Sequence, residues 1–103
     1  LYGAEYTVDT VKKNNNPEEL VTIAGKHCES GDVIVNDVKI PKLSEGDLIC
    51  IYNTGAYCYS MASNYNRIQK PAVVLVNDGL AEIIVKRQTL EQICEDDLIA
   101  EMI

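Results

Sequence analysis

The sequence contains no tryptophan and no phenylalanine, so its six aromatic residues are all tyrosines. It holds only nine lysine and arginine residues against sixteen aspartate and glutamate residues, a formal net charge of −7. Proteins bind the phosphate backbone of nucleic acids through clustered basic side chains, so this deficit argues against a nucleic-acid partner. No apolar run approaches the roughly 20 residues of a membrane helix, and the longest, such as Ala72–Val76, are strand-sized. We therefore expect neither a nucleic-acid nor a membrane partner.

The sequence shows no signal peptide and no metal-binding motif. The chain opens at Leu1 without an initiator methionine or a signal peptide, and we expect it to be part of a longer polypeptide. The cysteines form no Cys-x-x-Cys pair and His27 is the single histidine, so a zinc site is not expected. Their density is far below that of a disulfide-stapled secreted scaffold, which favours reduced thiols in a cytoplasmic protein. The cysteines are Cys28, Cys50, Cys58 and Cys94.

Length and composition indicate one domain over residues 1–103, large enough for a single core. Short apolar or alternating runs separated by turn residues predict about six strands. The predicted strands are Ala4–Val11, Glu19–Lys26, Val33–Val35, Leu48–Tyr52, Ala72–Val76 and Leu80–Lys86. Among them, Leu48–Tyr52 has the pattern of a strand buried on both faces. The polar run Lys12–Pro17 predicts a loop, Asn36-Asp37 a turn, and Ile40–Asp47 another loop.

Three local signals complete the predicted secondary structure. Asn77-Asp78-Gly79 between two apolar runs predicts a β-hairpin. Thr89 followed by Gln92 has the form of a capping box and predicts a helix from Leu90 to about Ile99. Ser60–Asn66 can form one or two helical turns. The predicted fold is therefore mainly β, a small Greek-key-like β-barrel or sandwich with one or two short helices.

The run from His27 to Asp32 places a thiol between an imidazole and a carboxylate at the end of a predicted strand. Cys28 in this setting could be a nucleophile, a proton donor or a redox centre, or simply a buried small apolar residue. On an extended segment, His27 and Glu29 point to the face opposite Cys28, which argues against a local Cys–His pair. From the residues alone, Glu29 and Asp32 are read as turn residues that satisfy backbone N–H groups near Gly31.

Four of the six tyrosines fall within fourteen positions, at Tyr52, Tyr57, Tyr59 and Tyr65. A buried tyrosine needs a partner for its hydroxyl, so Tyr52 and Tyr59 are interpreted as core residues whose hydroxyls reach the surface. Tyr57 follows Gly55-Ala56 at a strand-to-helix junction, where a ligand contact is plausible because a helix start also offers N–H groups to an anion.

The segment Cys-Glu-Ser-Gly-Asp at 28–32, together with Gly-Ala-Tyr-x-x-Ser-Met-Ala-Ser-Asn-Tyr-Asn at 55–66, resembles the diaminopimelate decarboxylase family. These are pyridoxal-phosphate enzymes of the alanine racemase-like fold class. Further pieces match in the same order, at Leu1–Ala4, Leu43–Asp47 and Pro71–Val76, so the resemblance covers nearly the whole chain.

The resemblance implies a C-terminal β domain. In the family, a (β/α)8 barrel carries the cofactor lysine and a β domain completes the site, and this chain resembles only the second part. None of its seven lysines lies in a context like that of the cofactor lysine, so the chain alone is expected to be inactive. The full-length enzyme would bind pyridoxal phosphate, convert meso-diaminopimelate to L-lysine and CO2, and form a homodimer in which the Cys-Glu segment enters the neighbouring subunit's site.

Residue roles follow from the same resemblance. Loss of the carboxylate leaves a carbanion that must be protonated, and Cys28 is the implied proton donor. Glu29 would bind the distal ammonium group of the substrate. Tyr2 would bind a substrate carboxylate, and Tyr57 would contact both cofactor and substrate. Asp32 would orient the loop that carries Cys28.

The chain departs from the family pattern at a few positions, notably at Cys58, where glycine is frequent. Two alternatives stay open. One is a related decarboxylase acting on ornithine, arginine or carboxynorspermidine, although Glu29 favours diaminopimelate because the ornithine-type relatives usually place aspartate after the cysteine. The other is a non-catalytic β binding module.

Overall fold

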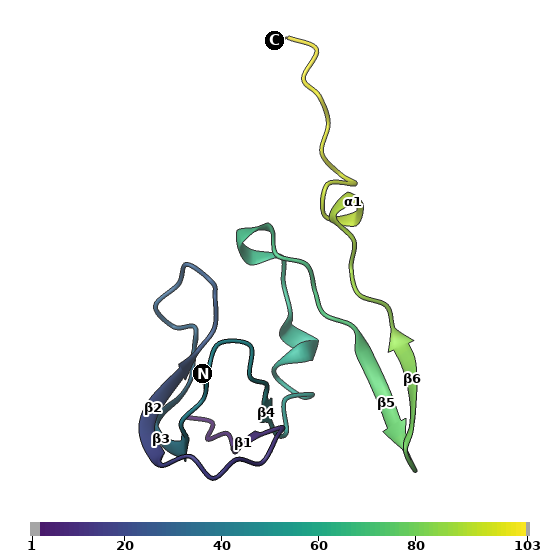
Figure 1. Cartoon of the computed structure of the whole chain (residues 1–103). Helices are drawn as coiled ribbons and strands as arrows, with labels where there is room; N and C mark the ends of the chain where they lie inside the picture. Colours follow the sequence, from purple (N-terminus) through teal and green to yellow (C-terminus); the bar gives the residue numbers. More distant parts are fainter. Residues whose placement is uncertain (1–2, 103) are drawn as a thin grey trace. The chain divides into compact units, whose positions relative to one another are not determined.

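The computed structural model of the chain describes residues 3–102 and consists mainly of strands (Figure 1). Contacts divide it into two compact units, one ending at Met61 and one beginning at Ala62. The first contains β1 (Val8–Thr10), β2 (Glu18–Ala24), β3 (Val33–Pro41), β4 (Ile49–Ile51) and the 3-10 turn η1 (Tyr59–Met61). The second contains the 3-10 turn η2 (Tyr65–Arg67), β5 (Val73–Asn77), β6 (Leu80–Val85) and α1 (Leu90–Ile93). The mainly β class with short helices is confirmed.

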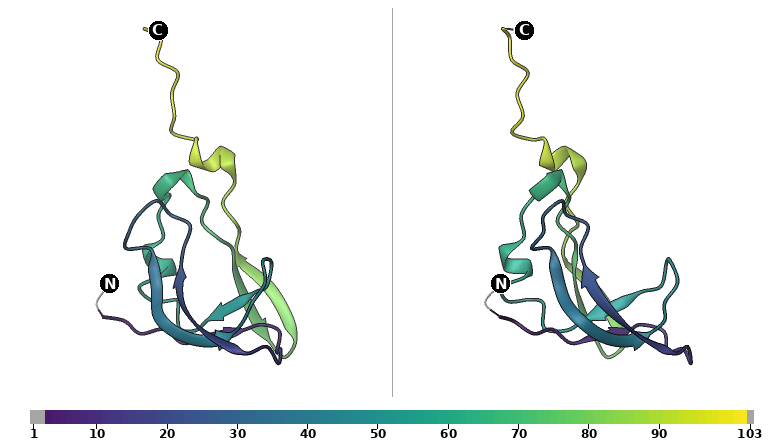
Figure 2. Two further views of the ribbon diagram at one scale, coloured as in Figure 1. Left: turned by 60° about the vertical axis from the view of Figure 1, so that its left-hand side comes forward. Right: turned by 90° about the vertical axis from the view of Figure 1, so that its left-hand side faces the viewer.

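The β2–β3 ribbon is the longest paired element of the first unit, and it bends along its length (Figure 2). The prediction of a turn at Asn36-Asp37 was wrong, because β3 runs through both residues to Pro41. The register moves from Val21↔Val38 to Ile23↔Val35, so the pair Asn36-Asp37 lies opposite one residue of β2 as a β-bulge. Asp37 adopts φ +53°, a backbone conformation that aspartate tolerates better than most residues.

The β1–β4 pair is shorter than predicted. It joins Val8↔Ile51 through Thr10↔Ile49, flanked by bonds from the Tyr52 N–H to the Thr7 carbonyl and from the Val11 N–H to the Leu48 carbonyl, so the first residues of the predicted strand Ala4–Val11 are not paired. The prediction that the latter is buried on both faces was wrong: β4 is only half-buried, and Leu48 is 68% exposed. Within residues 3–102, β4 pairs with β1 alone, so it lacks the second neighbour that a central strand would have.

Burial in the first unit is deepest where β1 lies against β3. Ile40 on β3 and Thr10 on β1 are each 6% exposed, and they are the buried residues of the described chain. Ile40 was predicted to lie in a loop. It is a strand residue instead, because its alternation with Val38 along β3 places both side chains on the less exposed face.

The hairpin β5–β6 of the second unit is confirmed, with Asn77 in the strand rather than in the predicted turn. Its last pair is Asn77↔Leu80, which leaves Asp78 and Gly79 as a two-residue turn. Their φ angles of +48° and +77° are those of a type I′ turn, the type whose twist matches paired strands. Figure 1 shows the two strands side by side along their length.

The capping box at the start of α1 is also confirmed. The Gln92 N–H donates to Thr89 Oγ1 at 3.2 Å, and the Thr89 N–H donates to Gln92 Oε1 at 2.9 Å. The predicted end near Ile99 was wrong, because α1 ends at Ile93. The acidic run that follows is unfavourable at the negative end of a helix, and the side chains of Leu98 and Ile99 are more than nine-tenths exposed, so no packing supports further turns.

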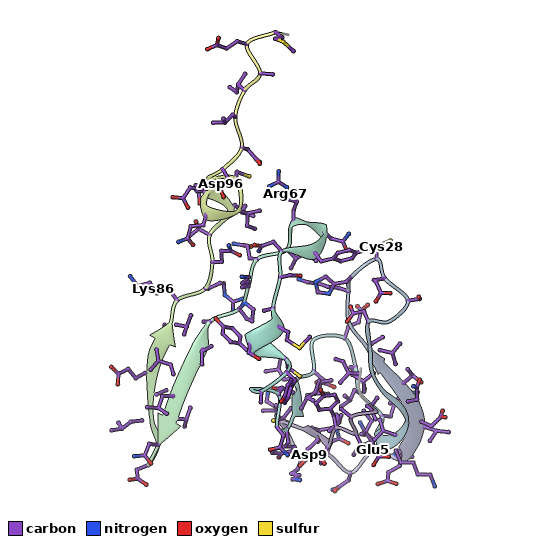
Figure 3. All side chains as sticks on the ribbon, turned by 180° about the vertical axis from the view of Figure 1, so that it is seen from behind. Glu5, Asp9, Cys28, Arg67, Lys86 and Asp96 are labelled. Atoms are coloured by element: carbon purple, nitrogen blue, oxygen red, sulfur yellow. The ribbon has the colours of Figure 1, made fainter. Side chains whose placement is uncertain are left out.

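Arg67 closes the C-terminal end of this single turn. Its Nη1 donates to the Ile93 carbonyl at 3.1 Å and its Nη2 donates to Asp97 Oδ2 at 2.6 Å. Figure 3 shows the Arg67 side chain next to the turn that leads to Asp96. The Asp97 carboxylate raises the pKa of Arg67 above its ordinary value.

The helical turns expected over Ser60–Asn66 are present as the 3-10 turns η1 and η2. Each of these turns extends one residue beyond the predicted range.

Candidate functional site

The segment that carries Cys28 is a hydrogen-bonded loop at the end of the β2–β3 ribbon. Beyond the last pair of the ribbon, the Gly25 N–H donates to the Asp32 carbonyl at 2.9 Å. Inside the loop, the Glu29 N–H donates to the His27 carbonyl at 2.8 Å, and the Asp32 N–H donates to the Glu29 carbonyl at 3.1 Å. Residues 26–31 are therefore folded as bends and a turn. Figure 3 shows Cys28 on this loop.

Asp32 holds the loop through one carboxylate oxygen. Its Oδ2 accepts the His27 backbone N–H at 2.8 Å and lies 3.1 Å from His27 Nδ1. The backbone N–H lowers the pKa of Asp32 most, and the imidazole adds to the effect, so Asp32 is ionised at neutral pH. An ionised carboxylate can only accept, so Nδ1 carries the hydrogen in this pair. The prediction that Asp32 satisfies a backbone N–H in this turn is confirmed.

Carboxylate groups of the loop approach two of its glycines closely. A β carbon on Gly25 would overlap the Asp32 carboxylate, and one on Gly31 would lie 2.6 Å from Glu29 Oε2. Gly25 thus leaves room for the carboxylate that closes the loop. Gly31 leaves room for the Glu29 side chain to fold back over the chain.

Cys28 and Glu29 are both exposed on this loop. The reading of Cys28 as a buried small apolar residue was wrong, because its place at the tip of a turn keeps it out of the core. The expectation that His27 and Glu29 point away from Cys28 assumed an extended segment. This assumption was also wrong, because the segment is folded as bends and a turn. The loop therefore offers a thiol and a carboxylate on adjacent residues, with the neighbouring imidazole bound to Asp32.

Tyr57 lies on a second loop, the turn after β4. The Tyr59 N–H donates to the Thr54 carbonyl at 3.2 Å, and the Tyr57 N–H donates to Ser60 Oγ at 3.1 Å. Tyr57 adopts φ +61° and is 76% exposed. A left-handed backbone costs a bulky residue about 1–2 kcal/mol, and such strain gathers at functional sites. The turn therefore presents the Tyr57 side chain to solvent in a conformation that its surroundings must maintain.

Tyr52 and Tyr59 were interpreted as core residues. Tyr59 is half-buried, but Tyr52 is 46% exposed because β4 ends before it.

A contact that the sequence did not predict joins Tyr6 to this turn. The Tyr6 hydroxyl lies 3.0 Å from Cys58 Sγ, and both residues are half-buried. This hydrogen bond is the main cause of the raised pKa of Tyr6, and desolvation adds to it. The two residues are 52 positions apart, so no local pattern could have paired them. The only sign of this contact in the sequence was Cys58 itself, at a position where glycine is frequent in the family.

The structure thus places two of the predicted site residues, Cys28 and Glu29, on one loop, and Tyr57 on another. Tyr2 lies outside the described residues. Within residues 3–102, no group of three or more His, Cys, Asp or Glu side chains is arranged to hold a metal ion. No helix in the same range has the length and apolar character needed to cross a membrane. None of the four cysteines, all of them among the described residues, is in a disulfide.

The family model described as "Pyridoxal-dependent decarboxylase, C-terminal sheet domain" matches residues 1–55, slightly more than half of the chain. Among curated proteins, a diaminopimelate decarboxylase from Staphylococcus aureus is 50% identical over 98 residues, which is 94% of this chain and 23% of that protein. One from Bacillus subtilis is 48% identical over 99 residues, which is 95% of this chain and again 23% of that protein. The chain therefore spans about a quarter of the length of these relatives.

Solved structures agree with the sequence relatives. A crystal structure of diaminopimelate decarboxylase from M. jannaschii superimposes with a TM-score of 0.90 at 34% identity, covering 99% of this chain and 23% of that one. A structure of the M. jannaschii enzyme in complex with L-lysine superimposes with a TM-score of 0.90 at 35% identity, covering 98% of this chain and 23% of that one.

Proposed function

The chain belongs to the pyridoxal-dependent decarboxylase family, whose C-terminal sheet domain it matches, and we propose that residues 1–103 form this domain in a diaminopimelate decarboxylase. The whole enzyme would convert meso-diaminopimelate to L-lysine and CO2. The observation that carries the proposal is the loop at the end of the β2–β3 ribbon. It exposes Cys28 and Glu29 side by side while Asp32 holds its backbone.

Cys28 is the proton donor in this proposal. Bound pyridoxal phosphate supplies the electron sink that stabilises the carbanion left when the carboxylate departs. A proton must then reach that carbon, and an exposed thiol on a hydrogen-bonded loop is a suitable general acid. The two hydrogen bonds that Asp32 Oδ2 accepts from His27 restrict the residue just before Cys28, so the thiol is presented from a defined backbone.

Glu29 is the recognition residue for the distal end of the substrate. An exposed carboxylate can form a charge-assisted hydrogen bond with an ammonium group, which is about twice as strong as a neutral one. The Glu29 carboxylate lies close to Gly31, so its side chain folds back toward the loop. Glu29 therefore suits a diamino acid, whose second amino group the loop can distinguish from a methyl or a carboxylate.

Tyr57 fits a contact with the cofactor. The residue is 76% exposed, and its backbone N–H donates to Ser60 Oγ in the turn that follows β4. A phenol in this setting can pack against a pyridine ring or donate to a phosphate oxygen. Tyr57 would hold pyridoxal phosphate and substrate from one side, and Tyr2 would bind a substrate carboxylate. The lysine that holds the cofactor covalently would come from outside residues 1–103.

The site is expected to be shared between subunits. A cavity of about 400 Å³ lies between residues 11–16 and 43–48, but Cys28, Glu29 and Tyr57 do not line it. These three residues are exposed, and a homodimer in which they enter the neighbouring subunit's site would enclose them. The substrate would be a small amino acid.

The four cysteines are not in disulfides, which supports a cytoplasmic enzyme.

The test is decarboxylation by the full-length polypeptide that contains residues 1–103, loaded with pyridoxal phosphate. We expect equimolar CO2 and L-lysine from meso-diaminopimelate, and kcat/KM at least tenfold lower for ornithine, arginine and carboxynorspermidine. Residues 1–103 alone, as the control, should release no CO2. A preference for one of the other amines would assign the domain to a related decarboxylase, and no turnover of any of them would favour a non-catalytic binding module.

A further inference from the structure

We propose that Tyr6 is a positioning residue for Tyr57 and acts on it through Cys58. The proposal rests on the role of Tyr57 given above. Its basis is the 3.0 Å contact between the Tyr6 hydroxyl and Cys58 Sγ, which ties the segment before β1 to the residue that follows Tyr57.

Tyr6 is a fixed point from which such a tether can act. The neighbouring Thr7 carbonyl accepts the Tyr52 N–H at 2.9 Å, and the β1–β4 pairing continues from there with Val8↔Ile51. The backbone that follows Tyr6 is therefore held by strand pairing. Because Tyr6 is half-buried, its ring has fewer rotamers to explore than an exposed side chain would have.

The turn has a conformation that such a tether can stabilise. Tyr57 has φ +61° and is 76% exposed, and a left-handed backbone is strained in a residue that carries a β carbon. The bond from its N–H to Ser60 Oγ is internal to the turn and moves with it. The contact of Cys58 with Tyr6, in contrast, connects the turn to a different part of the first unit. A glycine at position 58 would offer no side chain for it.

The test uses four variants of the full-length protein: Tyr6→Phe, Cys58→Ala, Cys58→Ser and the double variant Tyr6→Phe/Cys58→Ala. Tyr52→Phe is the matched control, because its hydroxyl makes no hydrogen bond with any residue from 3 to 102. The first readout is hydrogen–deuterium exchange of peptides covering residues 54–60. The second is the division of any kinetic effect between KM for meso-diaminopimelate and kcat.

We expect exchange to be about 2- to 10-fold faster in Tyr6→Phe and Cys58→Ala, the range that one net hydrogen bond allows. The double variant should match either single variant, because both remove the same bond. Cys58→Ser should stay within twofold of the wild type, because its hydroxyl can replace the thiol as a partner. In the variants with faster exchange, KM should rise while kcat changes less than twofold. Tyr52→Phe should change neither the exchange nor KM.

Unchanged exchange in both single variants, or effects that add in the double variant, would overturn the proposal. So would faster exchange without a rise in KM. A wild-type protein that decarboxylates none of the amino acids would instead refute the function proposed for the domain, and the exchange result would still show whether Tyr6 holds the turn.

Discussion

Asp32 and His27 are joined twice through a single oxygen atom, because Asp32 Oδ2 accepts the His27 backbone N–H at 2.8 Å and lies 3.1 Å from its Nδ1. These bonds span the loop residues Cys28 and Glu29. The conformation in which the loop presents its thiol and its carboxylate therefore depends on the ionised form of Asp32.

The Asp32–His27 pair predicts a specific pH dependence of stability. The folded-state pKa of Asp32 lies below its ordinary value of 3.8. Its contribution to the free energy of unfolding is thus fully present above that value and is lost as the pH falls through the folded-state pKa. In urea unfolding of the full-length protein from about pH 5 down to about pH 2, Asp32→Asn should lose less stability than the wild type. Equal losses in the two proteins would show that Asp32 is not linked to folding.

Gly25 predicts a steric effect on the same loop. A β carbon at this position would displace the Asp32 carboxylate from His27, so Gly25→Ala should lower the free energy of unfolding by about 1 kcal/mol or more. Gly55→Ala is the control, because a β carbon there meets no atom within 4 Å. Urea unfolding of the two variants measures the difference. A Gly25→Ala protein as stable as Gly55→Ala would mean that the carboxylate can move without cost.

The hairpin predicts a purely conformational effect at Gly79. Its φ is +77° and a β carbon would meet nothing within 4 Å, so the loss in Gly79→Ala comes from the backbone alone. The free energy of unfolding should fall by about 1–2 kcal/mol in Gly79→Ala. Urea unfolding again measures it. No loss would imply that the turn rearranges to a type that alanine accepts.

Glu29 predicts how the enzyme recognises the distal amino group. Replacing the carboxylate in Glu29→Gln removes a charge-assisted bond, so kcat/KM for meso-diaminopimelate should fall about 10- to 150-fold. Steady-state kinetics with 2-aminopimelate, which lacks the distal amino group, supplies the control. The variant and the wild type should use that analogue equally well. A similar loss with both substrates would place Glu29 in loop structure rather than in recognition.

The elements that the sequence predicted well are those specified by neighbouring residues. The turn at Asp78-Gly79 and the capping box of Thr89 and Gln92 each need only a few consecutive side chains, and both form as expected. The length of α1 was overestimated because the capping box specifies only where the helix begins. Whether the helix continues depends on packing, and Leu98 and Ile99 are not packed against other residues but almost fully exposed.

Longer-range relationships were less predictable. Asn36-Asp37 has the composition of a turn, but pairing with β2 absorbs it as a bulge. For the candidate site, the motif around Cys28 identified the residue types, and the structure added how the loop is held. The contact of Tyr6 with Cys58 depends on the pairing of β1 with β4, which no local pattern specifies.

The proposed reaction requires Cys28 as the proton donor, and the decisive measurement is the turnover of Cys28→Ala in the full-length enzyme. Cys94→Ala is the matched control, because Cys94 is also exposed and belongs to no proposed site. We expect kcat for meso-diaminopimelate to fall by about 10²- to 10⁴-fold in Cys28→Ala, with spectroscopic titration showing unchanged binding of pyridoxal phosphate, and to stay normal in Cys94→Ala. Turnover of Cys28→Ala within a fewfold of the wild type would exclude Cys28 as the proton donor.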